Sequence, residues 1–157
     1  MARYEDQVGK AGQNVAASAL RRLGIECVEK IGTPVKLIPR GKWGAQITYQ
    51  VIWGEKVAGD HRGILPGGRS VLAETKTILD RNLRWSDLLE HQPRKLSAHA
   101  EAGGLSLLVW VHSTGVYVMQ WPVPGFGPGR SIVPKQAGIF SAIFESTLDI
   151  HLRGGTL

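Results

Sequence analysis

Two carboxylates flank a glycine-rich segment that is typical of a tight turn. Asp60 and Glu74 each lie seven residues from Gly67. If residues 59–65 and 70–77 form antiparallel strands around this turn, the two carboxylates lie directly opposite each other, with Cβ atoms ~5 Å apart. Like charges at that separation repel and would destabilise a purely structural sheet. The spacing therefore predicts a binding site between the two carboxylates.

A divalent cation would relieve this repulsion. Carboxylate oxygens are hard ligands that suit Mg²⁺, which also retains several water molecules. Lys76 follows Glu74 by two residues, so it projects from the same face of the predicted strand. It can approach a metal-bound water or a phosphate group. The pattern alone leaves a second interpretation open, in which Glu74 and Lys76 are ordinary surface charges on an exposed hairpin.

Several helices and strands must position these residues. Apolar and small side chains recur at helical spacing from Glu5 to Leu23, which places Glu5 at the inward edge of a predicted helix. Gly24 is expected to end that helix, and a short strand is predicted over 25–29. Further strands are predicted over residues 48–53, 59–65, 70–77, 105–111 and 116–121. This order predicts an α/β fold, with a mixed β-sheet flanked by helices in a single domain of residues 1–157.

A second helix is predicted within residues 86–102, where apolar side chains again have helical spacing. Pro93 is disfavoured in a helix interior, because it lacks the backbone N–H and its ring clashes with the preceding turn. Two interpretations remain open. Either the helix begins near Glu90 and Pro93 lies in its first turn, or the helix is kinked at Pro93.

Positive charge is concentrated in one part of the chain. The 157 residues carry 19 Lys and Arg against 13 Asp and Glu, a formal net charge of +6. Residues 30–69 contain seven basic and two acidic residues, and their glycines and prolines predict a protruding basic loop or irregular hairpin over 30–46. Such a segment suits a polyanion such as nucleic acid. A solvated surface that keeps the protein soluble would have the same composition.

Composition excludes several other classes of protein. The longest strongly apolar run, 105–111, is far shorter than the ~20 residues that span a bilayer. Acidic residues near the amino terminus interrupt any signal-peptide core. A single cysteine, Cys27, excludes an internal disulfide and a multi-cysteine zinc site, and we expect it to be buried. We therefore expect a cytoplasmic protein that is not associated with membranes.

The motifs together resemble one nuclease family. Asp60, the Glu74-Thr75-Lys76 triplet and a histidine-glutamine pair at 91–92 follow one another in this order. On these residues the chain resembles the RecU-type Holliday junction resolvases of the PD-(D/E)xK nuclease superfamily. The resemblance extends from Glu5 to Trp121 and implies a restriction-endonuclease-like fold with a protruding basic stalk.

The resemblance also implies a chemistry. It implies Mg²⁺-dependent hydrolysis of phosphodiester bonds, with Mn²⁺ as a substitute, in which Asp60, Glu74 and the Thr75 carbonyl bind the metal. Lys76 would orient or activate the attacking water and stabilise the transition state. Glu5 would hold a metal-bound water or a second metal. Gln92 would steady the phosphate or the nucleophile, although a buried glutamine satisfied by the backbone fits the same position.

A DNA substrate and a dimer follow from the same resemblance. Symmetric nicking of a four-way DNA junction requires two sites related by a two-fold axis, and hence a homodimer. The stalk would enter the junction, where Trp43 stacks on a base pair or, equally well, packs against the dimer partner. The DNA-binding residues expected on this basis are Lys30, Lys36, Arg40, Lys42, Trp43 and Arg62.

The expected function is therefore that of a Holliday junction resolvase, a DNA-associated endodeoxyribonuclease acting in recombination and repair. Two alternatives remain. One is a non-catalytic module that binds branched DNA on the same fold, and the other is a PD-(D/E)xK nuclease that cuts duplex DNA. The paired carboxylates favour an enzyme over the module, and the basic stalk favours junctions over duplexes.

Overall fold

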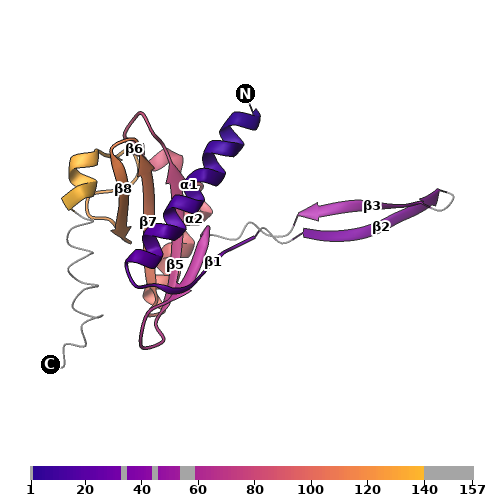
Figure 1. Cartoon of the computed structure of the whole chain (residues 1–157), viewed down its shortest axis with the longest axis horizontal. Coiled ribbons are helices and arrows are strands. Elements are labelled where there is room, and N and C mark those ends of the chain that lie inside the picture. Colours follow the sequence, from indigo (N-terminus) through magenta and orange to yellow (C-terminus); the bar gives the residue numbers. More distant parts are fainter. Residues whose placement is uncertain (1, 33–34, 44–45, 54–58, 140–157) are drawn as a thin grey trace.

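The computed structural model describes the backbone of residues 2–32, 35–43, 46–53 and 59–139, and the side chains within 7–32 and 59–139. Its centre is a five-stranded mixed sheet (Figure 1). In spatial order the strands are β1 (Glu26–Lys30), β4 (His61–Ile64), β5 (Ser70–Thr77), β7 (Leu105–His112) and β8 (Gly115–Gln120). Only the β5–β7 pair is parallel, and the other neighbours are antiparallel. The predicted α/β class, with its mixed sheet flanked by helices, is confirmed.

Two helices cover opposite faces of this sheet. Helix α1 (Ala2–Arg22) packs through Ala16 and Leu20 on the face that includes Ala73 and Leu107. Helix α2 (His91–Glu101) packs on the other face through Leu96, with Leu108, Trp110 and Met119 in the same apolar cluster. Successive strand residues point to opposite faces, so β7, which is buried along nearly its whole length, contributes to both clusters.

Close contact between α1 and β5 depends on a glycine. A Cβ atom at Gly12 would collide with the hydroxyl group of Thr77. The missing side chain lets the helix axis approach the strand that carries the candidate residues. A larger residue at this position would therefore push α1 away from the sheet.

The predicted basic segment contains a β-hairpin that extends away from the five-stranded sheet (Figure 1). Strand β2 (Val35–Trp43) pairs antiparallel with β3 (Gln46–Trp53), with a register shift between Pro39 and Gly41. The expected stalk of residues 30–46 thus contains only the first strand of this hairpin. The second strand, of which 48–53 were predicted as a strand, forms its other half, because the two strands satisfy each other's backbone hydrogen bonds.

The second helix is shorter than the periodicity of residues 86–102 indicates. A short strand β6 (Leu83–Arg84) and a single 3₁₀ turn η1 (Trp85–Asp87) precede it, and α2 itself begins at His91. Pro93 therefore lies in the first turn, where backbone N–H groups have no partner within the helix. This confirms the first of the two interpretations of Pro93. Strand β9 (Ser131–Ile132) pairs with β6 in a separate two-stranded sheet.

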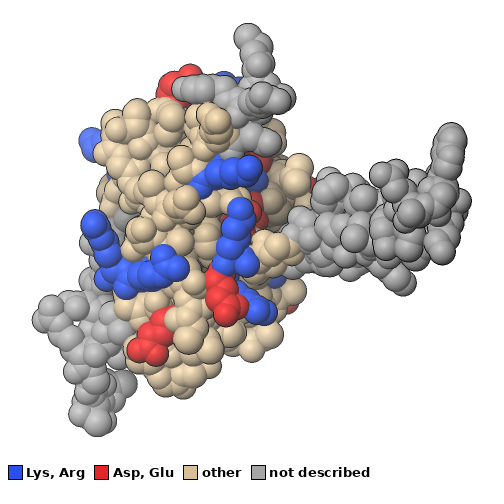
Figure 2. Space-filling view, turned by 45° about the vertical axis from the view of Figure 1, so that its right-hand side comes forward, with Lys and Arg blue, Asp and Glu red and all other residues tan. Residues whose placement is uncertain are grey.

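The surface of the described part carries more basic than acidic side chains on the face seen in Figure 2. Within the described residues, no helix has the length and apolar character needed to cross a membrane. Cys27 is exposed rather than buried as expected, because it lies on β1, an edge strand with most of its residues exposed.

Candidate active site

The strand register ends next to the two carboxyl-bearing residues, Asp60 and Glu74. In the β4–β5 pair, Ile64 lies opposite Ser70 and His61 lies opposite Ala73. Asp60 comes just before β4, and its backbone N–H donates to the Ala73 carbonyl at 2.8 Å. The predicted hairpin around the 66–68 turn is therefore confirmed over residues 61–64 and 70–73, and Asp60 and Glu74 lie next to its last pair.

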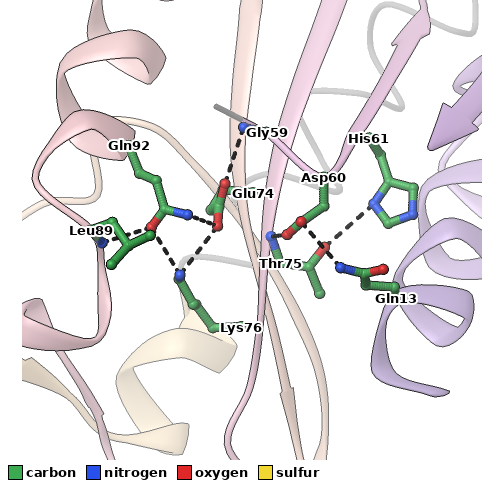
Figure 3. Close-up of polar contacts among 9 residues, drawn as sticks. All are labelled: Gln13, Gly59, Asp60, His61, Glu74, Thr75, Lys76, Leu89 and Gln92. Carbon is green, nitrogen blue, oxygen red and sulfur yellow. Dashed lines mark hydrogen bonds and ion pairs between the residues drawn. The ribbon is translucent and has the colours of Figure 1, made fainter. Parts of the chain in front are cut away.

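Asp60 lies just before β4 and joins α1 to β5 (Figure 3). Its Oδ1 atom accepts a hydrogen bond from Nε2 of Gln13 at 3.1 Å. Its Oδ2 atom accepts one from the backbone N–H of Thr75 at 2.8 Å. An ionised carboxylate has about four lone-pair positions, so Asp60 retains acceptor capacity for a further ligand.

Glu74 is almost completely buried, with 2% of its surface exposed. Its Oε2 atom accepts a hydrogen bond from the backbone N–H of Gly59 at 3.1 Å, and its Oε1 atom accepts one from Nε2 of Gln92. The ammonium group of Lys76 lies 3.2 Å from the same Oε1. Gly59 has a φ angle of +85°, a conformation that favours glycine, and this conformation directs its N–H toward the carboxylate.

Lys76 and Gln92 form a second link between β5 and α2. The Lys76 Nζ donates a hydrogen bond to Oε1 of Gln92 at 2.9 Å, and the backbone N–H of Leu89 donates to the same oxygen at 2.8 Å. Gln92 therefore contacts both members of the Glu-x-Lys pair and a backbone group. From the sequence, Gln92 was either a residue of the site or a buried glutamine satisfied by the backbone. In the structure it makes both kinds of contact.

Burial and charge oppose each other at Glu74. Burial raises the pKa of its carboxyl group, the negative charge of Asp60 raises it further, and the nearby Lys76 lowers it. The Asp60 carboxylate is thus close enough to disfavour ionisation of Glu74. His61 has a lowered pKa, chiefly because of burial, which outweighs the opposite effect of Asp60. A positive charge bound between the carboxylates would relieve their repulsion.

Gln13 was not predicted from the sequence, although it is the α1 side chain that contacts Asp60. It lies in α1, as Glu5 does, eight residues further along the chain. Its Oε1 atom is buried and has no hydrogen-bond partner among the described residues. Gln13 and Gly9 line a cleft of about 290 Å³ together with Lys76. The signal in the sequence was a polar side chain next to the tightly packed Gly12.

The other predicted site residues are placed as follows. Glu5 lies in α1, and its side chain is outside the described residues. Lys30 is exposed at the end of β1, opposite His61. Arg62 is exposed and forms an ion pair with Glu29 at 2.8 Å, so part of the positive charge expected to face DNA is already paired. The side chains that lie outside the described residues also include Lys36, Arg40, Lys42 and Trp43.

The donor set of the site fits a hard divalent cation. Asp60, just before β4, and Glu74, in β5, supply carboxylate oxygens, and the Thr75 carbonyl is a third oxygen of the type that Mg²⁺ prefers. No cluster of three or more His, Cys, Asp or Glu side chains occurs within residues 7–32 and 59–139. Among those residues, side-chain ligation would therefore rest on the two carboxylates, with water completing the coordination.

Comparison with known proteins adds little to this geometry. No protein-family model and no curated protein matches the sequence. Among solved structures, the crystal structure of SSO0001 is similar over 90% of this chain, with 14% sequence identity and a TM-score of 0.40. This chain spans 59% of the length of that protein. A TM-score this low assigns neither a fold family nor an activity.

Proposed function

We propose that the protein is a metal-dependent endodeoxyribonuclease of the PD-(D/E)xK type, with a restriction-endonuclease-like fold, that acts on four-way DNA junctions. The observation that carries this proposal is the placement of Lys76 3.2 Å from Glu74, with the Asp60 carboxylate bonded to the backbone N–H of the next residue, Thr75, at 2.8 Å. Metal-assisted phosphodiester hydrolysis uses carboxylates that bind the metal and a cation that stabilises negative charge on the phosphate. Asp60, Glu74 and Lys76 are groups of these types, and a cleft borders Lys76.

Each side chain has a role in this proposal. Asp60, Glu74 and the Thr75 carbonyl would hold Mg²⁺, or Mn²⁺ in its place. The metal, when bound, supplies a Lewis acid that stabilises negative charge on the phosphate. Lys76 orients the attacking water and stabilises charge that develops in the transition state. Gln92 holds the Lys76 ammonium group at 2.9 Å and so fixes its direction.

Junction selectivity and dimerisation are further parts of the proposal. The β2–β3 hairpin extends away from the sheet (Figure 1), and its sequence contains Lys36, Arg40 and Lys42. A basic projection of this kind suits the open centre of a four-way junction, where phosphates converge. Paired nicks on opposite strands would require two copies of the chain related by a two-fold axis.

One observation favours a second candidate, a DNA-binding module without catalysis. Both carboxylates hydrogen-bond backbone N–H groups, and a sheet without any enzymatic role could keep them for that purpose. The two candidates differ in the fate of a labelled four-way junction in Mg²⁺ and in EDTA. Paired nicks that EDTA abolishes support the nuclease, equal cutting of a linear duplex removes junction selectivity, and tight binding without cutting supports the module.

A further inference from the structure

A hollow of about 350 Å³ lies on the corner of the molecule formed by η1 and the start of β9. Arg84, Trp85 and Ser86 line one side, and Arg130 and Ser131 line the other. The two sides are fixed to each other, because Arg84 pairs with Ser131 in the β6–β9 ladder. The backbone N–H of Trp85 also donates to the Arg130 carbonyl at 3.0 Å. The hollow is therefore built from two hydrogen-bonded segments.

Its lining combines two cations with an aromatic ring. Arg84 and Arg130 are exposed, and neither forms an ion pair with a carboxylate of the described residues. The Trp85 ring is held in place by stacking on Trp121, with ring centroids 5.8 Å apart, and by an edge contact with Phe126 at 5.3 Å. A guanidinium group can donate two parallel hydrogen bonds to a phosphate. A fixed aromatic ring offers a surface on which a base or sugar can pack.

The hollow is directly connected to the candidate active site. Asp87 accepts a hydrogen bond from the Arg84 backbone N–H at 2.8 Å and forms an ion pair with Arg81 at 2.8 Å. Arg81 and Asp87 line the cleft that also contains Lys76. The cleft and the hollow therefore lie on two sides of the same short turn. The segment 81–87 thus contributes residues both to the cleft that contains Lys76 and to the hollow.

We infer that this hollow, defined by Arg84, Trp85 and Arg130, binds a nucleotide of the DNA strand that extends from the cleavage site. This inference rests on the proposed function and adds a DNA contact outside the β2–β3 hairpin. The volume of the hollow, about 350 Å³, is in the range of pockets that hold one small ligand, ~300–1,000 Å³. The two guanidinium groups contact the phosphate, and Trp85 contacts the adjoining base or sugar.

The test measures DNA affinity rather than cleavage. A labelled four-way junction is titrated with wild-type protein and with the Arg84→Ala/Arg130→Ala variant, in EDTA and at several salt concentrations. Loss of the contact with this phosphate is expected to raise Kd about tenfold and to make the slope of log K against log salt shallower by about 0.9. The matched control is Arg22→Ala/Lys135→Ala, which removes the same charge at two exposed positions outside the hollow. The control is expected to bind as the wild type does.

Three results would overturn the inference. One is wild-type affinity and salt slope in the Arg84→Ala/Arg130→Ala variant. Another is an equal loss of affinity in the control, which would reflect net charge alone. The third is found by titration with deoxyadenosine monophosphate. If the free nucleotide binds in a way that depends on the two arginines while DNA affinity is unchanged in the variant, the hollow does not bind the DNA strand. Failure of the proposed function is separate, because wild-type protein would then bind the junction without cutting it in Mg²⁺.

Discussion

Asp60 and Glu74 each hydrogen-bond the backbone of the segment that carries the other. The Asp60 carboxylate accepts from the N–H of Thr75, which follows Glu74, and the Glu74 carboxylate accepts from the N–H of Gly59, which precedes Asp60. These reciprocal bonds hold the two carboxylates on neighbouring segments, with Asp60 directed toward Gln13 of α1 and Glu74 toward Gln92 of α2 (Figure 3). The arrangement is therefore in place before any ligand binds, as a preorganised metal site requires.

Metal binding should be visible as a gain in stability. Mg²⁺ that binds the folded protein alone is expected to raise Tm, with a stabilisation of about 2.7 kcal/mol at a concentration 100 times Kd. In Asp60→Asn this increase should be absent, because the variant lacks one of the two charged ligands. The measurement is a thermal melt with and without Mg²⁺. The exposed Asp80→Asn is the matched control, and an equal Mg²⁺ effect in Asp60→Asn and wild type would exclude the carboxylate pair as the site.

Gln92 should contribute to stability as well as to the site. Replacing it with leucine removes the partners of Leu89 N–H, Glu74 and Lys76 in a buried position. We expect a loss of about 1–3 kcal/mol in the free energy of unfolding, measured by urea titration. The control is Gln136→Leu, which affects an exposed glutamine whose one side-chain hydrogen bond among the described residues is with Val133 N–H. A Gln92→Leu variant as stable as this control would mean that the buried network contributes nothing.

The contact between α1 and β5 predicts opposite effects at two glycines of one helix. Gly12→Ala would place a methyl group against Thr77, and the overpacking is expected to cost about 1–3 kcal/mol. A Cβ at Gly9 meets nothing within 4 Å. Gly9→Ala is therefore expected to stabilise the helix by about 0.5–1 kcal/mol. Denaturant titration of both variants decides the matter, and equal effects would contradict the packing of α1 described above.

His99 should make stability fall at mildly acidic pH. Burial, with a smaller effect of Arg69, lowers its pKa below the ordinary value of 6.5. Below pH 6.5 the unfolded chain is protonated first, so stability is fully present above that pH and is lost as pH falls toward the folded-state pKa. The Tm of His99→Gln should decline less steeply over this range than that of the wild type. Parallel declines would show that His99 titrates equally in both states.

The sequence predicted the local geometry of the site well, because strand alternation and a short turn determine which residues are opposite each other. The hairpin register depends only on the 66–68 turn, and it is confirmed up to the pair of His61 and Ala73, the neighbours of Asp60 and Glu74. Gln13 was missed, since its contact with Asp60 joins segments 47 residues apart. Such a contact depends on how closely α1 packs on the sheet.

The remaining differences have the same kind of cause. The helical periodicity of residues 86–102 begins before α2 because Leu88, which directly follows η1, is buried as it would be on a helix. Cys27 was expected inside, but a short strand at a sheet edge leaves most of its side chains in solvent. In both cases local pattern predicts which residues are apolar, and tertiary packing decides which are covered.

The central claim is tested most directly by cleavage of a labelled four-way junction by wild-type protein and by Asp60→Asn and Lys76→Met. We expect paired nicks with the wild type in Mg²⁺, none in EDTA, and rates at least about 10²-fold lower in both variants. Junction affinity in EDTA should be unchanged in Asp60→Asn, which retains the basic surface. Wild-type cleavage rates in Asp60→Asn, or cleavage that persists in EDTA, would contradict the account.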